Sequence, residues 1–306
     1  MKLGFSINAF AGDRFRPFPQ KALEIIADAG FEYIELVFDK PYFWLKDFEL
    51  QRVAEIKTFL KRHHLSVVDV SACTAGGYER PDDDVAPPGQ RFGPSFADKD
   101  EARRKLRVEH VKKVIDFAVM LDCLNVNTST GYQPEDRTFK DSWRDVRDCY
   151  REVVKHAKER DVWVNIEYEP GTYGPGGLFI ANAEDTLKMI EDVGMDNLGV
   201  NYDIGHSFVC HEDIPQVIRT FAERGLLQHI HIEDIAEKED STRVHFHLIP
   251  GDGNIDFLPI LQTLKEVNYE GCVTLELYSL WDKNPAEACL KSYQYLTSNF
   301  GEFFGD

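Results

Sequence analysis

The sequence predicts an α/β protein of the (β/α)8 TIM-barrel class, with one parallel eight-stranded barrel forming a single domain over residues 1–306. Short β-branched or apolar runs alternate with longer segments of 3.6-residue periodicity, which is the pattern of strand–helix units around a parallel sheet. Eight such units follow one another, the number that closes a barrel of this kind. A length of 306 residues is ordinary for one barrel domain.

The expected strands are short and rich in apolar residues. They are Leu3–Ile7, Tyr33–Val37, Ser66–Ala72, Leu124–Thr128, Trp163–Glu167, Leu198–Asp203, His229–Glu233 and Cys272–Leu277. Each is followed by a segment whose apolar residues recur at helical spacing. These segments are Pro19–Ala29, Phe48–His64, Lys99–Leu121, Phe139–Arg160, Ala183–Val193, Ile214–Arg224, Phe257–Val267 and Pro285–Asn299.

The long connections follow strands rather than helices. They are Cys73–Asp98, Gly131–Thr138, Pro170–Leu178 and Asp234–Asn254. Long loops without structure of their own are usually lids or binding loops. The segment Arg80–Pro94, with four prolines and three consecutive aspartates, could instead be disordered. Because barrel enzymes build their sites at the carboxyl ends of the strands, we expect the functional site at this C-terminal rim.

Composition excludes several classes of partner. With 35 basic and 53 acidic residues the net charge is -18, so nucleic acid would be repelled and is not expected to bind. No apolar run is long enough to span a membrane, and the first residues resemble a strand rather than a signal peptide. The six cysteines have neither zinc-finger nor redox spacing. We therefore expect a cytoplasmic protein with reduced thiols.

Acidic or imidazole side chains lie at the ends of the last four expected strands: Glu167, Asp203, His231 and Glu276. In a parallel barrel such side chains point toward a common centre, where half-desolvated carboxylates must bind a cation or be protonated. Oxygen ligands with one imidazole suit Mn²⁺, Mg²⁺, Co²⁺ or Zn²⁺. We expect one divalent ion, with Mn²⁺ as the first choice, and coordination positions left open for substrate oxygens.

Each of these residues also has a purely structural alternative. Glu167 or Glu276 alone could line the barrel in an ion pair, although no basic residue is adjacent to either in the sequence. Asp203 could cap the helix that follows it. His229 and His231 lie on the same face of one expected strand, and a hydrogen-bonded core histidine is the ordinary interpretation of one of them. We favour His231 as the ligand.

Further polar residues are candidates for contacting a substrate. His206 follows the sixth strand and would reach the same pocket if the chain turns helical there. If residues 245–248 are extended, His245 and His247 lie on one side, and the glycines at 251 and 253 are interpreted as a plain turn. Glu35 and Glu169 are also candidates, although a helix-cap or surface role is equally open for both. The expected substrate contacts are Glu35, Glu169, His206 and His247.

The most specific stretches are NYDIGH at 201–206, HIHIED at 229–234 and HLIPGDGNID at 247–256. They resemble the xylose isomerase-like barrel superfamily, which includes sugar and sugar-phosphate isomerases and epimerases, inosose-processing enzymes and the type IV apurinic (AP) endonucleases. The likeness covers nearly the whole chain. It implies metal ligands at Glu167, Asp203, His231 and Glu276, and substrate contacts at His206 and His247.

This resemblance implies a metal-dependent sugar isomerase or epimerase acting on a ketose or a related keto-sugar or polyol. In that chemistry the metal stabilises an enediolate, and Glu167 and Glu276 act as acid and base on opposite faces of the substrate. The acidic balance of the chain favours an unphosphorylated substrate. Barrels of this kind often form dimers or tetramers, so a homo-oligomer is expected.

Three other functions stay open. The same enolate could expel a β-substituent, giving a dehydratase, a lyase or an enzyme that cleaves 3-oxo-glycosides. An AP endonuclease-like DNA-repair nuclease is disfavoured by the charge, and because the third and fourth strands offer no histidine for that branch's metal cluster. His245 and His247 do match positions where that branch binds a further zinc, which leaves a second metal open. A barrel that binds sugar without catalysis is opposed by the two glutamates.

Overall fold

We describe the protein from a computed structural model. The structure describes residues 1–10, 19–39, 50–74, 92–170, 178–277 and 284–305. Within them, eight parallel strands with helices between them close into a barrel in the order β1-β10-β7-β6-β5-β4-β3-β2. This confirms the predicted fold class. The barrel strands are β1 (Lys2–Ser6), β2 (Tyr33–Val37), β3 (Ser66–Ser71), β4 (Asn125–Thr128), β5 (Trp163–Ile166), β6 (Leu198–Asp203), β7 (Leu227–Ile232) and β10 (Cys272–Leu275).

The long helices lie where the apolar periodicity predicts them, with ends shifted by a few residues at most. They are α1 (Gln20–Ala29), α2 (Leu50–Arg62), α3 (Glu101–Met120), α4 (Phe139–Lys158), α5 (Ala183–Val193), α7 (Ile214–Glu223), α8 (Phe257–Glu266) and α9 (Pro285–Phe300). Short 3-10 turns, η1 (Ile7–Phe10) and η4 (Gly301–Phe303), follow β1 and α9. No helix in the described ranges has the length and apolarity that crossing a membrane requires.

The chain divides into two compact units. The first unit comprises Met1–Leu36, Glu49–Val68 and Asn201–Asp306, and the second comprises Val37–Phe48 and Asp69–Val200. Strands β1, β7 and β10 belong to the first unit, β4 and β5 belong to the second, and β2, β3 and β6 each run from one unit into the other. The single domain over 1–306 stays a prediction.

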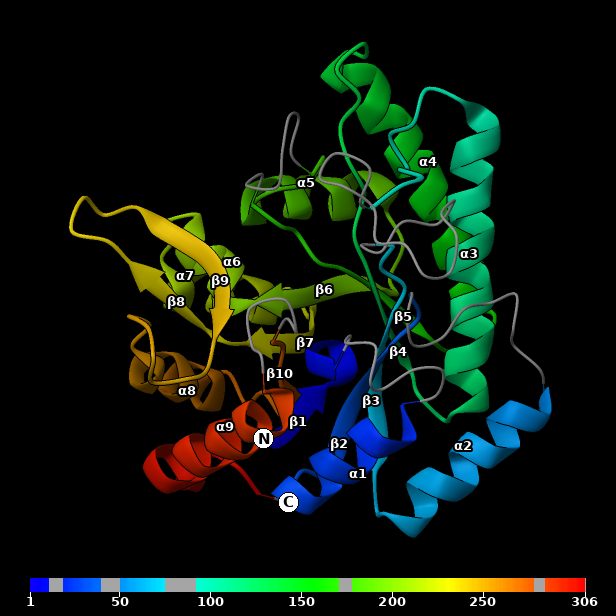
Figure 1. The fold of residues 1–306 in the computed structure, drawn as a ribbon. Helices are drawn as coiled ribbons and strands as arrows, with labels where there is room; N and C mark the ends of the chain where they lie inside the picture. Colours follow the sequence, from blue (N-terminus) through cyan, green and yellow to red (C-terminus); the bar gives the residue numbers. More distant parts are fainter. Residues whose placement is uncertain (11–18, 40–49, 75–91, 171–177, 278–283, 306) are drawn as a thin grey trace. The chain divides into compact units, whose positions relative to one another are not determined.

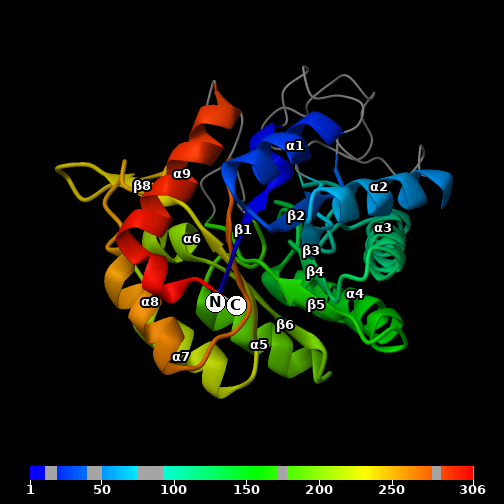
Figure 2. The same cartoon turned by 90° about the horizontal axis from the view of Figure 1, so that it is seen from below.

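In the first unit, β1 pairs with both β10 and β2, and the register sets Ser6 beside Glu35. Outside these strands, α1 and α9 lie side by side, and the rings of Phe31 and Tyr293 are 5.0 Å apart. The two ends of the chain lie next to each other (Figure 2), with the backbone amide of Gly305 donating to the carbonyl of Met1 at 3.1 Å.

The segment Asp234–Asn254 was expected to be a loop without structure of its own, and that expectation was wrong. It contains an antiparallel hairpin of β8 (Asp234–Glu237) and β9 (Arg243–Leu248). Burial alternates along β9, with His245 and His247 buried and Phe246 exposed, because one face of this strand packs on α6 (Ile204–Val209). Figure 1 shows α6 beside the hairpin.

In the second unit, α3 and α4 lie side by side (Figure 1). Both helices begin at a capping side chain: Asp100 accepts a hydrogen bond from the backbone amide of Ala102, and Thr138 accepts one from that of Asp141. Apolar side chains and the fully buried guanidinium of Arg107 fill the space beneath α3. Two of its nitrogens donate there, Nη1 to the hydroxyl of Thr74 and Nη2 to the carbonyl of Ser129.

Candidate metal centre

Three of the four predicted metal ligands converge in the first unit. Asp203 ends β6, His231 lies on β7 and Glu276 follows β10. Nδ1 of His231 is 3.9 Å from Oδ2 of Asp203 and 3.6 Å from Oε2 of Glu276. Each of the three residues offers one ligand atom within 4.8 Å of the others. Two carboxylates and an imidazole therefore face one another around a common point.

Asp203 has the helix-capping role that the sequence left open as an alternative, while its role as a metal ligand stays a prediction. Its Oδ1 accepts a hydrogen bond of 2.6 Å from the backbone amide of His206 and so caps α6. The other carboxylate oxygen faces His231. The capping bond fixes the orientation of the carboxylate, and the same turn of helix carries His206 back toward the site.

His231 is held from the side opposite the two carboxylates. Its Nε2 lies 2.5 Å from Oε2 of Glu35, and the other oxygen of Glu35 accepts a 2.7 Å hydrogen bond from the hydroxyl of Ser6. Glu35, at the end of β2, was expected to contact a substrate. It is fully buried against His231.

Glu276 lies just beyond the last paired residue of β10, and its backbone amide still donates to the carbonyl of Ile232. The side-chain amide of Asn8 donates to its Oε1 at 3.2 Å. The backbone amide of Asn8 also donates to the hydroxyl of Ser6. Ser6 at the end of β1 therefore contacts Glu35, and Asn8 in η1 contacts Glu276.

A further carboxyl group, that of Glu233, is fully buried beside the centre. Burial, followed by the charges of Asp203 and then Glu276, raises the pKa of Glu233 well above its usual value. The side chain fits only because residue 205 is glycine: a Cβ atom there would lie 1.7 Å from Oε1 of Glu233. The alternation of β7 places Glu233 on the same face as His231, but no sequence signal marked it as part of the site.

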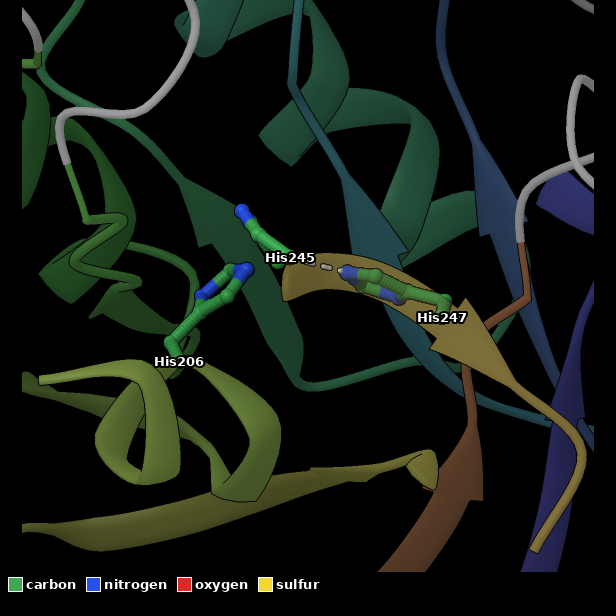
Figure 3. Close-up of side chains that lie close together, drawn as sticks. All are labelled: His206, His245 and His247. Carbon is green, nitrogen blue, oxygen red and sulfur yellow. Dashed lines mark hydrogen bonds between the residues drawn. The ribbon is translucent and has the colours of Figure 1, made fainter. Parts of the chain in front are cut away.

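A second group consists of three buried imidazoles, those of His206, His245 and His247, which we call the histidine cluster (Figure 3). Their ligand nitrogens lie within 4.8 Å of one another, and Nε2 of His245 is 3.1 Å from Nε2 of His247. Burial is the main cause that lowers the pKa of His245 and of His247 well below the usual value, so both rings are neutral near pH 7.

The histidine cluster connects to the proposed ligands through the backbone. Nδ1 of His247 is 2.7 Å from the carbonyl oxygen of Glu276. Because a carbonyl only accepts, His247 carries its proton on Nδ1 and presents the lone pair of Nε2 to its neighbours. The side-by-side placement of His245 and His247 follows from the alternation predicted for this stretch. The second metal expected as one alternative stays a prediction.

The second unit holds the fourth predicted ligand, Glu167, immediately after β5. The side-chain amide of Asn127 on β4 donates to Oε2 of Glu167 at 2.6 Å. Glu169, an expected substrate contact, is buried in the same unit. Burial and then the charge of Asp39 raise the pKa of the Cys73 thiol, and the charges of Glu169 and Glu167 add to this effect. Several acidic groups therefore lie together at the ends of β2, β3 and β5.

The residues of the first unit fit a divalent cation. Two carboxylates and a neutral nitrogen are ligands that such ions accept, and carboxyl groups at this burial repel one another unless a positive charge or a proton is added. Burial raises the pKa of Glu233 most, and the charges of Asp203 and Glu276 raise it further. A bound cation would relieve this repulsion for Asp203 and Glu276.

Comparisons with known proteins agree with this architecture. The model of the xylose isomerase-like TIM barrel family matches residues 23–298. An uncharacterised protein of Methanocaldococcus jannaschii, MJ1311, is 28% identical over 202 residues, which is 64% of this chain and 65% of that protein. An inosose dehydratase of Clostridium tetani is 27% identical over 170 residues, 51% of this chain and 54% of that enzyme. The chain thus matches less than two thirds of the length of either relative.

Solved structures share the fold over the whole chain. The IolI protein with a bound zinc atom superposes with a TM-score of 0.76 at 18% identity, covering all of both chains. A D-tagatose 3-epimerase-like protein gives a TM-score of 0.73 at 23% identity, covering 97% of this chain and 98% of the other. At these identities the likeness establishes the barrel fold alone.

Proposed function

The chain belongs to the xylose isomerase-like TIM barrel family, and on that premise we propose that it is a divalent-metal-dependent enzyme that isomerises or epimerises a ketose or a related keto-sugar or polyol. The observation that carries the proposal is the convergence of Asp203, His231 and Glu276 within 4.8 Å of one another. The three residues come from three neighbouring strands of the barrel.

We assign Glu167 as the fourth ligand. It follows Ile166, which pairs with Val200 on β6, and Asp203 ends that same strand. The carboxyl ends of neighbouring parallel strands open at the same end of a barrel, which supports a shared centre. Asn127 holds one oxygen of Glu167, just as Asn8 holds one oxygen of Glu276.

Mn²⁺ is the first choice of metal, because three carboxylates and one imidazole form a mainly oxygen-donor set. Mg²⁺, Co²⁺ and Zn²⁺ are the alternatives, and the zinc atom in the IolI structure supports the last. When bound, the cation supplies polarisation of a substrate carbonyl, which acidifies the neighbouring C–H and favours an enediolate.

The two glutamates perform the proton transfers in this proposal. Glu276 and Glu167 stand as base and acid on opposite faces of the substrate, and return of the proton from the second face inverts the carbon. The amide donors Asn8 and Asn127 each orient one carboxylate oxygen, that of Glu276 and that of Glu167. Substrate hydroxyls are assigned to His206, His247 and Glu169.

The test is solvent deuterium uptake by a panel of ketoses with Mn²⁺ present, followed by analysis of the products. We expect Glu276→Gln and Glu167→Gln each to lower the exchange rate by about 10²–10⁴. Glu270→Gln is the matched control, because Glu270 is exposed just before β10. The substitution removes the same charge as Glu276→Gln and Glu167→Gln do. Full activity of Glu276→Gln would refute its assignment.

A dehydratase or lyase is the second candidate, supported by the inosose dehydratase relative, of which the chain matches 54%. Both reactions begin by removing a proton next to a carbonyl, so the same residues serve either one. Product analysis separates them: epimerisation returns a sugar of unchanged mass apart from deuterium, whereas dehydration lowers the mass by one water.

A further inference from the structure

Glu35 stays a predicted substrate contact, and its contacts in the structure support a further role. We propose that Glu35 is a positioning residue: its carboxylate holds the His231 imidazole in the tautomer with hydrogen on Nε2, so that Nδ1 presents its lone pair to the cation. This inference rests on the proposed metal centre, because it assigns the residue that sets the orientation and basicity of one ligand.

The geometry around His231 separates the two ring nitrogens. Nε2 lies 2.5 Å from Oε2 of Glu35, which is hydrogen-bond distance. Nδ1 lies 3.6 Å from Oε2 of Glu276 and 3.9 Å from Oδ2 of Asp203. One nitrogen therefore faces a carboxylate that is held in place, and the other faces the two carboxylates of the candidate centre.

A neutral imidazole has one N–H donor and one nitrogen lone pair. An ionised carboxylate only accepts, so the nitrogen that contacts Glu35 is the one that carries the hydrogen. A carboxylate on the far side of a ligating histidine raises the basicity of the ligating nitrogen and fixes the plane of the ring. Both effects strengthen the bond that Nδ1 can form to a cation.

Glu35 is itself held in place by β1. The hydroxyl of Ser6 donates to Oε1 of Glu35, and the register of β1 against β2 sets these two residues opposite each other. The nearby Nε2 of His229 is 3.9 Å from Glu35, outside hydrogen-bond distance. Both oxygens of Glu35 are accordingly assigned, one to Ser6 and one to His231.

The turn η1, which follows β1, contacts a second proposed ligand. Asn8 donates to the hydroxyl of Ser6 through its backbone amide and to Oε1 of Glu276 through its side chain. A chain of contacts therefore runs from Glu276 through Asn8, Ser6 and Glu35 to His231. Because each member is buried or partly buried, the chain holds two of the ligands before any cation arrives.

The first experiment measures the affinity for Mn²⁺ alone, counting free Mn²⁺ by its electron paramagnetic resonance signal. Removing an outer carboxylate of this kind typically costs about 10–100-fold in metal affinity, and we expect that loss for Glu35→Gln. Ser6→Ala, which removes only the donor that orients Glu35, should give a smaller loss of the same sign. Glu32→Gln is the charge-matched control, because Glu32 is exposed three residues earlier, and it should bind as the wild type does.

The second experiment does not require metal. In the metal-free wild type, ¹⁵N-histidine NMR should show His231 with hydrogen on Nε2, and Glu35→Gln should populate the Nδ1–H tautomer. This readout also covers the case in which Glu35→Gln folds poorly, because the wild-type spectrum alone tests the tautomer. A wild-type His231 with hydrogen on Nδ1 overturns the inference.

The outcomes separate this inference from the proposed function. If the wild type binds Mn²⁺ and Glu35→Gln binds it equally well, the inference about Glu35 is wrong while the metal centre stands. If the wild type binds neither Mn²⁺ nor Zn²⁺, the proposed function fails, and the tautomer of His231 still decides whether Glu35 orients the ring.

Discussion

Gly205, in the first turn of α6, is the residue on which the packing of Glu233 depends. A Cβ atom at this position would lie 1.7 Å from Oε1 and 2.7 Å from Cδ of that fully buried side chain. We expect Gly205→Ala to lower the free energy of unfolding by about 1–3 kcal/mol, the usual cost of overpacking. Urea unfolding measures this change.

Gly301 provides the matched control for that substitution. A Cβ atom at Gly301 would meet nothing within 4 Å, and the residue has ordinary right-handed φ and ψ angles. Gly301→Ala should therefore leave the stability unchanged or raise it slightly. Equal stability of the two variants would show that Glu233 moves aside at no cost.

The buried His110 on α3 leads us to predict how the free energy of unfolding depends on pH. Burial, assisted by the charge of Arg107, lowers the pKa of His110 to about 3, whereas an unfolded histidine has a pKa near 6.5. Between these values the unfolded chain binds the proton and the folded chain does not. This contribution to stability is therefore complete above about pH 6.5 and is lost as the pH falls toward 3.

The loss attributable to His110 amounts to about 2 kcal/mol at pH 5. We expect His110→Gln to show a correspondingly smaller drop in unfolding free energy between pH 7 and pH 5, measured by urea unfolding of metal-free protein. The exposed His64, replaced by Asn, is the control and should keep the wild-type slope. A His110→Gln slope equal to that of the wild type would show that another group dominates.

At this scale the sequence predicts the residues that end strands and misses those that support them. Asp203, His231 and Glu276 were found because each ends an otherwise apolar strand, and the barrel brings such ends together. Asn8, Asn127 and Glu233 were not found. Their roles depend on cross-strand distances of a few ångströms, which strand register and side-chain rotamers determine and residue periodicity does not.

One carboxylate ties the start of the hairpin to the stretch that follows β9. Asp234, at the start of β8, accepts hydrogen bonds from the backbone amides of Ile235, Gly251, Gly253 and Ile255. The glycine-containing stretch, interpreted from the sequence as a plain turn, wraps around this side chain. Residue 253 must be glycine, because a Cβ atom there would lie 2.3 Å from Oδ1 of Asp234.

We expect Asp234→Ala to destabilise the fold by at least ~3 kcal/mol, because the substitution leaves several amide donors without their charged acceptor. Asp234→Asn, which keeps one acceptor oxygen, should cost less. Asp252, exposed in the same stretch, is the control position and tolerates alanine. Thermal and urea unfolding both report the ranking, and an Asp234→Ala variant as stable as Asp252→Ala contradicts it.

Among the elements, the eight barrel strands and the long helices were predicted, the helical turn of α6 was raised only as an alternative, and the hairpin was not predicted. Long helices have several turns over which the apolar period repeats, and the barrel strands have continuous apolar runs. The strand β9 instead alternates polar and apolar residues, and its buried residues are the histidines His245 and His247. Buried histidines do not add to the pattern of apolar residues from which buried strands are predicted.

For the molecule as a whole, the proposed metal centre predicts a stability that depends on the bound metal. A cation that binds only the folded chain stabilises it by about 2.7 kcal/mol at a concentration 100 times the dissociation constant. We expect Mn²⁺ to raise the thermal midpoint of chelator-treated wild type and of the Glu270→Gln control, with little effect on Glu276→Gln. If none of Mn²⁺, Mg²⁺, Co²⁺ and Zn²⁺ changes the thermal midpoint of the wild type, the proposed metal centre is contradicted.

The barrel class was predictable because it depends on the number and order of elements, which periodicity records along the chain. The division into two compact units was not. It cuts through β2, β3 and β6, and no change of composition or linker in the sequence marks those strands.

Because Gly305 contacts Met1, the order of the elements along the chain could be changed without changing which strands lie side by side. A short bridge could join these two residues, and a new opening could then be made at the exposed hairpin tip near Glu239. Such a circular permutant would begin with β9 and still bring β1 beside β10. Its folding would show that the barrel depends on which strands meet rather than on which strand is synthesised first.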